Sequence, residues 1–236
     1  MDKYPSYNVT VPTSAPGVMQ RVVVDWNQLI ARREFLLRDM PNDPDFNYLV
    51  LPEVERLLSS IEDGTTHLAA YTLWVTGARV SEMLMLRPED FQLEGNIDPC
   101  VKLPILKNRT PKKNRPPRRM IGLGDGPFIE TLRRYIKTQK IKRRELLFGQ
   151  LSRHAIRHRI NSAGRRVQPA LPLTINPHTL RHSYAINHLI HGKTPDQVRR
   201  LLGHTDMRST DVYLRVLSAD ISHHGAGTPF RLPIEA

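Results

Sequence analysis

The amino-acid sequence predicts a mainly α-helical fold with one small three-stranded antiparallel β-sheet, and three observations lead to this prediction. Apolar residues recur at the spacing of a helix face over most of the chain. Three short runs, at 91–93, 101–106 and 119–123, have the composition of strands, and a long basic hairpin loop joins the last two. The 236 residues, of which 39% are hydrophobic, also suffice for one sizeable core.

The expected helices are recognised from their apolar spacing and their end signals. The first, at about 20–40, places four apolar residues near one face. The next begins at Leu51 with proline in its first turn. Two more lie on either side of a turn at Gly77 and Ala78, one ending at about Thr76 and the other at about Leu86. The others are expected at about 126–139, 152–162, 178–191, 195–202 and 208–216.

Proline-rich stretches divide the chain into two parts. Residues 1–19 contain three prolines and little apolar periodicity, which predicts an extended or mobile arm. A second proline-rich link, PNDPD at 41–45, follows the first expected helix. We therefore expect an N-terminal arm with a single helix in residues 1–45, and one main domain with a short C-terminal tail in residues 46–236.

The positive charge of the chain is concentrated in one central stretch. The whole chain has a net charge of +12. Residues 102–166 hold 20 basic and 3 acidic residues, whereas residues 1–101 hold 8 and 15. Apolar residues at structural spacing interrupt the basic runs, which favours folded elements over a disordered tail. This pattern predicts a surface that binds the phosphates of a nucleic acid.

The composition and the start of the chain exclude several classes of protein. The single cysteine, Cys100, excludes a disulfide framework and any zinc site that needs two thiolates, and its place at a strand start predicts a small buried residue. The start MDKYPSYNVT lacks the profile of a signal peptide, and no apolar run approaches the roughly 18 residues of a membrane span. We therefore expect no membrane association and a location in the cytoplasm, at the nucleoid.

Residues suited to phosphate chemistry recur in the C-terminal third. Helical spacing places His178 and Arg181 one turn apart on the same face, so that an imidazole and a guanidinium converge on one small anion. His204 follows Arg181 by 23 residues, and Tyr213 follows His204 by 9 residues. Arg79 stands far upstream, in the segment TGARVSE, beside an expected helix end.

Together these segments resemble the tyrosine recombinase (phage integrase) family. The pattern R...HxxR...H...Y is formed by TGARVSE, PHTLRHSYAINHLIHG and LLGHTDMRSTDVYLRV, with LLGH at the second histidine and STDVY at the tyrosine. The resemblance covers about residues 46–216. It implies the catalytic-domain fold of that family of DNA breaking-rejoining enzymes. It also implies a site-specific DNA recombinase that requires neither a metal ion nor ATP nor any other cofactor.

The resemblance further implies a role for each residue of the pattern. The hydroxyl of Tyr213 attacks the scissile phosphate, which gives a 3′-phosphotyrosyl link and a free 5′-hydroxyl. Arg79 and Arg181 each offer paired N–H donors to the non-bridging oxygens of the transition state. Because the pKa of a free tyrosine is about 10, we expect His178 or His204 to supply a base or a hydrogen-bond donor. The pattern does not decide which histidine does which.

In the family, a lysine in the loop between the second and third strands protonates the leaving 5′-oxygen. The corresponding loop here contains three candidates, Lys107, Lys112 and Lys113. We favour Lys107, because it follows the apolar strand directly and so has the most rigid support. Counting back from the third strand instead favours Lys112 or Lys113.

The expected partner is double-stranded DNA. The basic residues expected to contact it are Arg109, Lys112, Lys113, Arg115, Arg118, Arg119, Arg153 and Arg157. We expect a monomer in solution that forms a homotetramer on two paired DNA sites, with a Holliday-junction intermediate. Most family members place a full core-binding domain before the catalytic domain, so about 45 preceding residues indicate a naturally short recombinase or a truncated form.

Three other interpretations use parts of the same pattern. His178 and His182 form an i, i+4 pair of the kind that binds zinc, but the HExxH glutamate is absent and no cysteine lies nearby, so we expect no metal site. A type IB topoisomerase-like enzyme needs the same residues, and relaxation of DNA without a partner duplex distinguishes it. The complete residue set disfavours a regulator that binds DNA on this fold without cleaving it.

Overall fold

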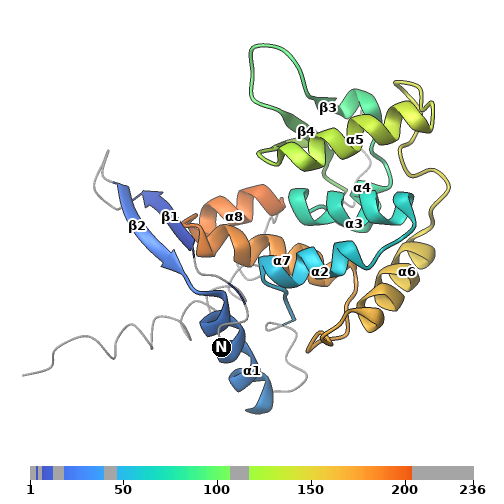
Figure 1. Cartoon of the computed structure of the whole chain (residues 1–236). Helices are drawn as coiled ribbons and strands as arrows, with labels where there is room; N and C mark the ends of the chain where they lie inside the picture. The colour runs from blue at the N-terminus through green and yellow to red at the C-terminus, as the bar shows by residue number, and fades with distance from the viewer. Residues whose placement is uncertain (1–3, 5–6, 13–18, 40–46, 107–116, 204–236) are drawn as a thin grey trace, which may run out of the picture.

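The computed structural model describes residues 4, 7–12, 19–39, 47–106 and 117–203, and its secondary structure confirms the predicted fold class (Figure 1). Apart from the N-terminal segment described below, the helices are α2 (Leu51–Ser59), α3 (Gly64–Thr76), α4 (Val80–Met83), α5 (Gly126–Thr138), α6 (Arg153–Arg166), α7 (Pro177–Ile190) and α8 (Pro195–Leu202), with a short 3-10 helix η2 at Pro88–Asp90. The helix α4 is shorter than the expected one, which reached residue 86. The helix expected at 208–216 lies outside the described residues.

The sheet has the strand order β3, β4, β5, and its neighbouring strands are antiparallel. The strands are β3 (Phe91–Gln92), β4 (Cys100–Pro104) and β5 (Arg118–Gly122). Val101 pairs with Ile121 on the buried face, whereas Lys102 pairs with Met120 on the exposed face. Cys100 is buried at the start of β4, as predicted.

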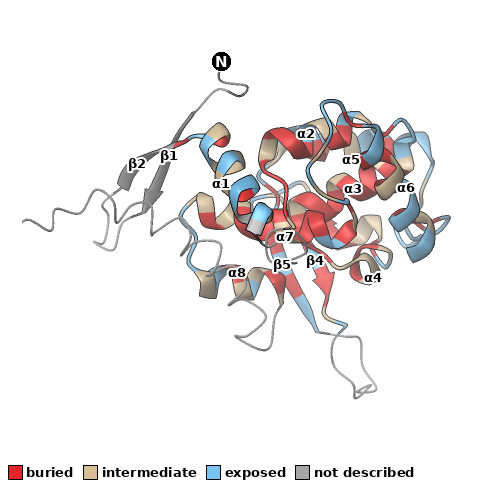
Figure 2. Cartoon of the chain, turned by 90° about the horizontal axis from the view of Figure 1, so that it is seen from below, coloured by how far each residue is buried: buried red, intermediate tan, exposed pale blue. Residues whose placement is uncertain are grey.

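The helix α3 lies at the centre of the core. It is apolar around most of its circumference, and eight of its 13 residues are buried. It contacts α5, α6 and α7. Figure 1 shows α5 and α7 on opposite sides of α3, and the red of buried residues surrounds α3 in Figure 2. Gly77 ends the helix at a φ of +59°, and the ring of Tyr184 occupies the place of a Cβ. Only glycine therefore allows α7 to approach this end of α3.

The N-terminal segment differs from the sequence prediction. Strands β1 (Tyr7–Pro12) and β2 (Met19–Val24) pair as an antiparallel hairpin, and helix α1 (Trp26–Asp39) follows. The prediction of a helix from residue 20 is therefore wrong up to residue 24. The valines at 22–24 are β-branched and favour a strand once β1 supplies the partner. The division of the chain at residue 45 stays a prediction.

A buried ion pair attaches α1 to α2. Arg33 donates to the two carboxylate oxygens of Glu53 over 2.7 and 2.6 Å, and to the carbonyl oxygen of Tyr48 over 2.7 Å. Glu53 also accepts the backbone N–H of Val50 at the start of α2. This ion pair therefore joins α1 to the first turn of α2. Within the described ranges, none of the helices combines the length and the hydropathy that a membrane crossing requires.

Candidate active site

An open cleft of about 540 Å³ lies where the N-terminal ends of α4, α6 and α7 come together. Its lining residues are Asn47, Arg79, Val80, Ser81, Arg153, Arg157, Asn176, Pro177, His178, Thr179 and His182. The structure thus brings together four residues that the sequence predicts for catalysis or DNA binding, namely Arg79, Arg153, Arg157 and His178. None of these described lining residues is a carboxylate, so the cleft is complementary to an anion.

The start of α7 presents its first turn to this cleft. The side-chain oxygen of Asn176 accepts the backbone N–H of His178 over 2.8 Å and that of Thr179 over 3.3 Å. Pro177 occupies the first helical position, where a missing N–H costs no hydrogen bond. The hydroxyl of Thr179 contacts Oδ1 of Asn47 over 3.2 Å, which fixes the turn in place. The positive end of the α7 dipole therefore faces the cleft.

His178 stands among arginines at the cleft. Partial burial lowers the pKa of its imidazole, and the charges of Arg181, Arg79 and Arg157 lower it further. The ring is therefore neutral at pH 7, and one of its nitrogens is free to accept a proton.

Arg181 lies one turn after His178 and is 5% exposed. Its Nη1 donates to the carbonyl oxygen of Gly77, and its Nη2 donates to that of Leu202 over 2.8 Å. These carbonyls stand at the C-terminal ends of α3 and α8, where a helix leaves C=O groups without partners. The guanidinium therefore holds two helix ends beside the cleft.

Glu82 connects the arginines of this region. Its buried carboxylate accepts the backbone N–H of Arg79 over 2.9 Å, Nη1 of Arg79 over 2.8 Å and Nη2 of Arg119 over 2.8 Å. Nη1 of Arg181 lies 4.0 Å from Oε2 of Glu82. Burial raises the pKa of Glu82, but the hydrogen bond and charge of Arg119, with help from Arg79 and Arg181, hold it below its usual value. The carboxylate therefore stays charged at neutral pH.

The sequence analysis did not single out Glu82, although part of its role had a signal. Glu82 is the third residue after Arg79, which is the spacing of the N-cap and N3 positions of a capping box, and it accepts the N–H of Arg79. Its contact with Arg119 joins residues 37 positions apart and has no local signal.

Arg153 and Arg157, both predicted to bind DNA, are exposed on α6 and line the cleft. They stand four positions apart, so both project from one face of the helix. The 14 residues of α6 include no acidic residue. No acidic side chain of α6 therefore neutralises the charges of these two arginines.

Arg118 and Arg119, also predicted to bind DNA, point to opposite faces of β5. Arg118 pairs with Asp90 and keeps 35% of its side chain exposed. Arg119 is 8% exposed, and its Nε donates to the carbonyl oxygen of Leu201 over 2.8 Å. Arg119 therefore does not present its guanidinium at the surface beside Arg118, because β5 turns its side chain into the core, where Glu82 neutralises it. Its contact with DNA stays a prediction.

Seven predicted residues lie outside the described part of the chain, and their roles stay predictions. They are Lys107, Arg109, Lys112, Lys113, Arg115, His204 and Tyr213. The described chain reaches Leu106 directly before the first of them, and Gly203 directly before His204.

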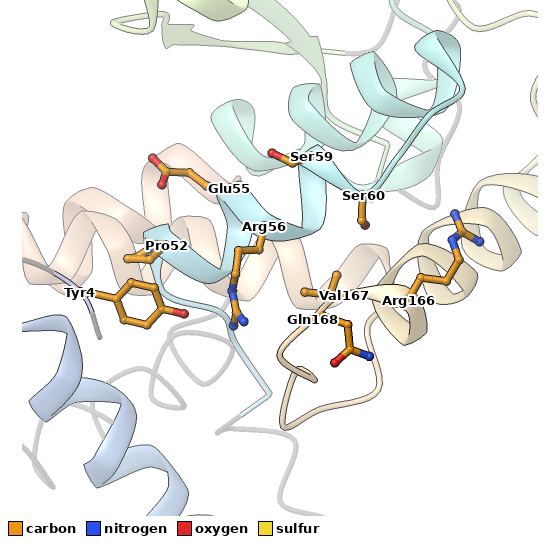
Figure 3. Close-up of a pocket in the computed structure, with 9 residues that line it drawn as sticks. All are labelled: Tyr4, Pro52, Glu55, Arg56, Ser59, Ser60, Arg166, Val167 and Gln168. Carbon is orange, nitrogen blue, oxygen red and sulfur yellow. The ribbon is translucent and has the colours of Figure 1, made fainter. Parts of the chain in front are cut away.

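A second pocket, of about 450 Å³, lies between α2 and the end of α6 (Figure 3). Its lining residues are Tyr4, Pro52, Glu55, Arg56, Ser59, Ser60, Arg166, Val167 and Gln168. Figure 3 shows Tyr4 beside Arg56, whose Nη1 donates to the carbonyl oxygen of Pro169 over 2.8 Å. The pocket contains no residue of the predicted site, and Glu55 gives it charge of both signs. It therefore lacks the anion-binding character of the first cleft.

Residues 47–219 match the model of the phage integrase family. A probable site-specific recombinase in the afa region of Escherichia coli is 33% identical over 181 residues, which cover 74% of this chain and 72% of that protein. A resolvase of Escherichia coli (strain K12) is 31% identical over 92% of this chain and 85% of that protein. Tyrosine recombinase XerD of Staphylococcus aureus is 34% identical, but the match covers 63% of this chain and 49% of XerD.

Solved structures of recombinases share the fold. XerA recombinase superposes with a TM-score of 0.60 at 20% identity, over 78% of this chain and 66% of that chain. XerH bound to its difH substrate gives a TM-score of 0.52 at 24% identity, over 75% of this chain and 52% of that chain. The catalytic domain of bacteriophage HP1 integrase gives 0.53 at 19% identity, over 80% of this chain and 98% of that domain. The described helices and sheet therefore have the fold of these catalytic domains.

Proposed function

Because this chain belongs to the phage integrase family and is a site-specific tyrosine recombinase, we propose that it cuts and rejoins double-stranded DNA through Tyr213. The observation that carries the proposal is the cleft in which Arg79, His178 and the start of α7 converge, with Arg181 anchored beside them. A scissile phosphate suits this arrangement, since guanidinium groups offer paired donors to its non-bridging oxygens. The structures of XerH and of the Tn1549 integrase are complexes with DNA, which supports DNA as the partner.

In the proposed cleavage step, Oη of Tyr213 attacks the phosphorus atom and the bond to the 5′-oxygen breaks. A 3′-phosphotyrosyl bond replaces the phosphodiester, and the tyrosine gives up its proton. Arg79 and Arg181 stabilise the charge that develops on the non-bridging oxygens. The neutral imidazole favours His178 as the proton acceptor, and His204 then donates a hydrogen bond to the phosphoryl group.

The 5′-oxygen leaves as a hydroxyl after it gains a proton. Lys107 is the proposed donor, and Lys112 or Lys113 is the alternative. In the rejoining step the 5′-hydroxyl of another strand attacks the phosphotyrosine and releases Tyr213. Each broken phosphodiester is thereby restored, so the cycle needs no nucleotide, and we propose that the two guanidinium groups make a metal ion unnecessary.

The proposed assembly is a homotetramer on two paired DNA sites, formed from subunits that are monomeric without DNA. Two duplexes have four strands to cut, and each subunit supplies one Tyr213. The exchange passes through a Holliday junction. Residues 46–236 form the catalytic domain in this proposal, and residues 1–45 precede it. Because the proposed substrate is DNA, we also propose a location in the cytoplasm, at the nucleoid.

Covalent capture tests the cleavage reaction. The substrate is a pool of nicked duplexes in which the sequence around the nick is randomised, so that cleavage releases a short fragment and traps the phosphotyrosyl link. We expect an adduct with the wild-type protein that resists denaturation, and none with Tyr213→Phe. Because one hydroxyl contributes little to a largely electrostatic interface, Tyr213→Phe should bind DNA within about threefold of wild type.

Two results would count against the proposal. An adduct that persists in Tyr213→Phe identifies a different nucleophile. A wild-type protein that captures no duplex from the whole pool contradicts the cleavage function.

A further inference from the structure

The buried guanidinium of Arg119 joins three segments of the chain. Its Nη2 donates to Oε2 of Glu82 in α4, and its Nε donates to the carbonyl oxygen of Leu201 in the last turn of α8, each over 2.8 Å. Arg119 itself belongs to β5, and its side chain is 7% exposed. A single side chain therefore ties a strand to two helices.

Each of these segments leads to a residue of the proposed reaction. Helix α4 begins directly after Arg79, which binds the same carboxylate as Arg119. Helix α8 ends one residue before Gly203, which His204 follows. Strand β5 follows, along the chain, the stretch 107–116 that includes Lys107. Arg119 thus joins three described segments, each of which borders a residue of the proposed reaction along the chain.

The turn after α8 packs directly against Arg119. Gly203 has a φ of +65°, and a Cβ at this position would lie 3.1 Å from Nη1 of Arg119. Nη1 is buried and has no hydrogen-bond partner among the described residues. Nη1 of the guanidinium therefore lies beside Gly203, the residue directly before His204.

Arg119 also favours the charged carboxylate of Glu82, which binds the guanidinium of Arg79. Among the groups that lower the pKa of Glu82, Arg119 ranks ahead of Arg79 and Arg181. Without Arg119, less opposes the rise in the pKa of Glu82 that burial causes, and a protonated carboxyl group accepts weaker hydrogen bonds. The guanidinium of Arg79 would then lose part of its support.

We propose that Arg119 is a positioning residue for strand transfer, which acts through Glu82 and the carbonyl of Leu201 on the relative places of Arg79 and Arg181. The inference rests on the proposed function. Nε and Nη2 of Arg119 are bound to Leu201 and Glu82, so the proposal assigns it an effect through these two groups. Displacement of catalytic groups by about 1 Å is enough to lower a rate by about 10²-fold.

The test compares Arg119→Lys with Arg134→Lys, the same change at an exposed arginine of α5 that is not among the predicted site residues. Lysine retains the positive charge, but its single ammonium does not reproduce the fork that binds Glu82 and Leu201 together. The substrate is a nicked duplex recovered from the wild-type adducts of the randomised pool. For each protein we would measure the single-turnover rate constant of adduct formation at saturating protein, the Kd for DNA and the thermal unfolding.

We expect Arg119→Lys to lower the rate constant by about 10²-fold. Its Kd should stay within about threefold of wild type, and its folded fraction should be unchanged at the assay temperature. Arg119→Gln, which keeps a donor for Glu82 without the charge, should lose at least as much. Arg134→Lys should keep the wild-type rate constant within about threefold.

A duplex with sulfur in place of the bridging 5′-oxygen locates the defect. A thiolate leaves without a proton, so this duplex bypasses the proton donor. It should not restore Arg119→Lys, because the affected groups are the arginines that bind the non-bridging oxygens.

The inference is overturned if wild type and Arg119→Lys have equal rate constants, or if Kd and the folded fraction account for the whole loss. Restoration by the bridging sulfur also overturns it, since the defect would then lie at the proton donor. Failure of the wild-type protein to capture any duplex is a different result. It contradicts the proposed function before any variant is compared.

Discussion

Two buried guanidinium-carboxylate contacts in this protein differ in how many partners they hold. Arg33 and Glu53 bind each other through two hydrogen bonds and are 1% and 2% exposed. Glu82 is as deeply buried, but Arg79, Arg119 and Arg181 all surround it. The side chain of Arg79 remains 24% exposed and reaches the cleft.

The difference teaches that burial of an ion pair does not by itself indicate function. The contact of Arg33 with Glu53 uses its donors inside the protein, and its effect is to attach α1 to α2. The carboxylate of Glu82 instead holds a guanidinium that keeps donors available at the cleft. The informative feature is the partly exposed member of the cluster, Arg79.

The largest expected effect on stability comes from breaking the contact between Arg33 and Glu53. Arg33→Ala leaves the carboxylate of Glu53 buried without its cation, so the free energy of unfolding should fall by about 3–5 kcal/mol. Denaturant unfolding beside the wild type measures this change. The rate constant of adduct formation per folded molecule should remain within about threefold. A loss of stability below about 1 kcal/mol would contradict the burial of this pair.

Arg79→Ala should have the opposite effect, with a slower cleavage rate and an almost unchanged free energy of unfolding. Removal of one donor to the non-bridging oxygens should lower the rate constant of cleavage by about 10²- to 10³-fold. Because Arg79 is partly exposed, the free energy of unfolding should change by no more than about 1 kcal/mol. The control is Arg134→Ala, an exposed arginine on α5, which should change neither quantity. If Arg79→Ala instead loses stability but cleaves at the wild-type rate, Arg79 supports the fold and not the reaction.

The pH dependence of stability compares the cleft side of α7 with its far end. Burial lowers the pKa of His182, which lines the cleft, to about 4, and burial also lowers the pKa of His188 to about 4. The folded state therefore binds fewer protons than the unfolded state between about pH 6.5 and pH 4. The free energy of unfolding should therefore decrease as the pH is lowered from about 6.5 to about 4, by up to about 1.4 kcal/mol per pH unit for each histidine.

Denaturant unfolding at several pH values measures this slope. His188→Gln should remove the contribution of His188 to this slope and retain the contribution of His182. An unchanged slope in this variant would show that His188 does not titrate differently in the two states.

The salt dependence of DNA binding compares the exposed arginines of α6 with the buried arginine of β5. Arg153→Gln and Arg157→Gln should each reduce the slope of log Kd against log salt by about 1, if each contacts one phosphate. Arg119→Gln should leave the slope unchanged, because its guanidinium is bound inside the protein. Equal reductions in all three variants would place Arg119 on the DNA.

The smallest expected effect is that of removing divalent metal ions. Adduct formation in EDTA should equal that in its absence, since two guanidinium groups supply positive charge at the phosphate. Titration of EDTA and then of Mg²⁺ into the capture assay measures this. A loss that Mg²⁺ restores would assign a catalytic metal.

Much of the fold was predictable because its signals are local. Asn176 and Pro177 mark the start of α7, and Thr194 and Gly203 mark the two ends of α8. The same locality places His178 and Arg181 on one face. The strand at 19–24 was missed because its pairing partner lies at 7–12, and the apolar residues of this stretch also fit a helix.

Side chains alternate between the two faces of β5, and the sequence analysis did not use this pattern. Arg119 and Ile121 are two positions apart and therefore share a face, and that face is buried. Charge alone assigned Arg119 to the DNA-binding surface. The strand pattern would have assigned it to the interior.

The sequence by itself determined the order of helices and strands, the basic central stretch and the spacing of the predicted catalytic residues, because each depends on neighbours along the chain. Only the tertiary structure decided which charged side chains are buried and what they bind. A buried charge is stable only beside its partner, and Arg119 and Glu82 meet across 37 positions of sequence. For this reason the cleft could be anticipated from residue types, whereas the cluster that supports it became visible only in the folded chain.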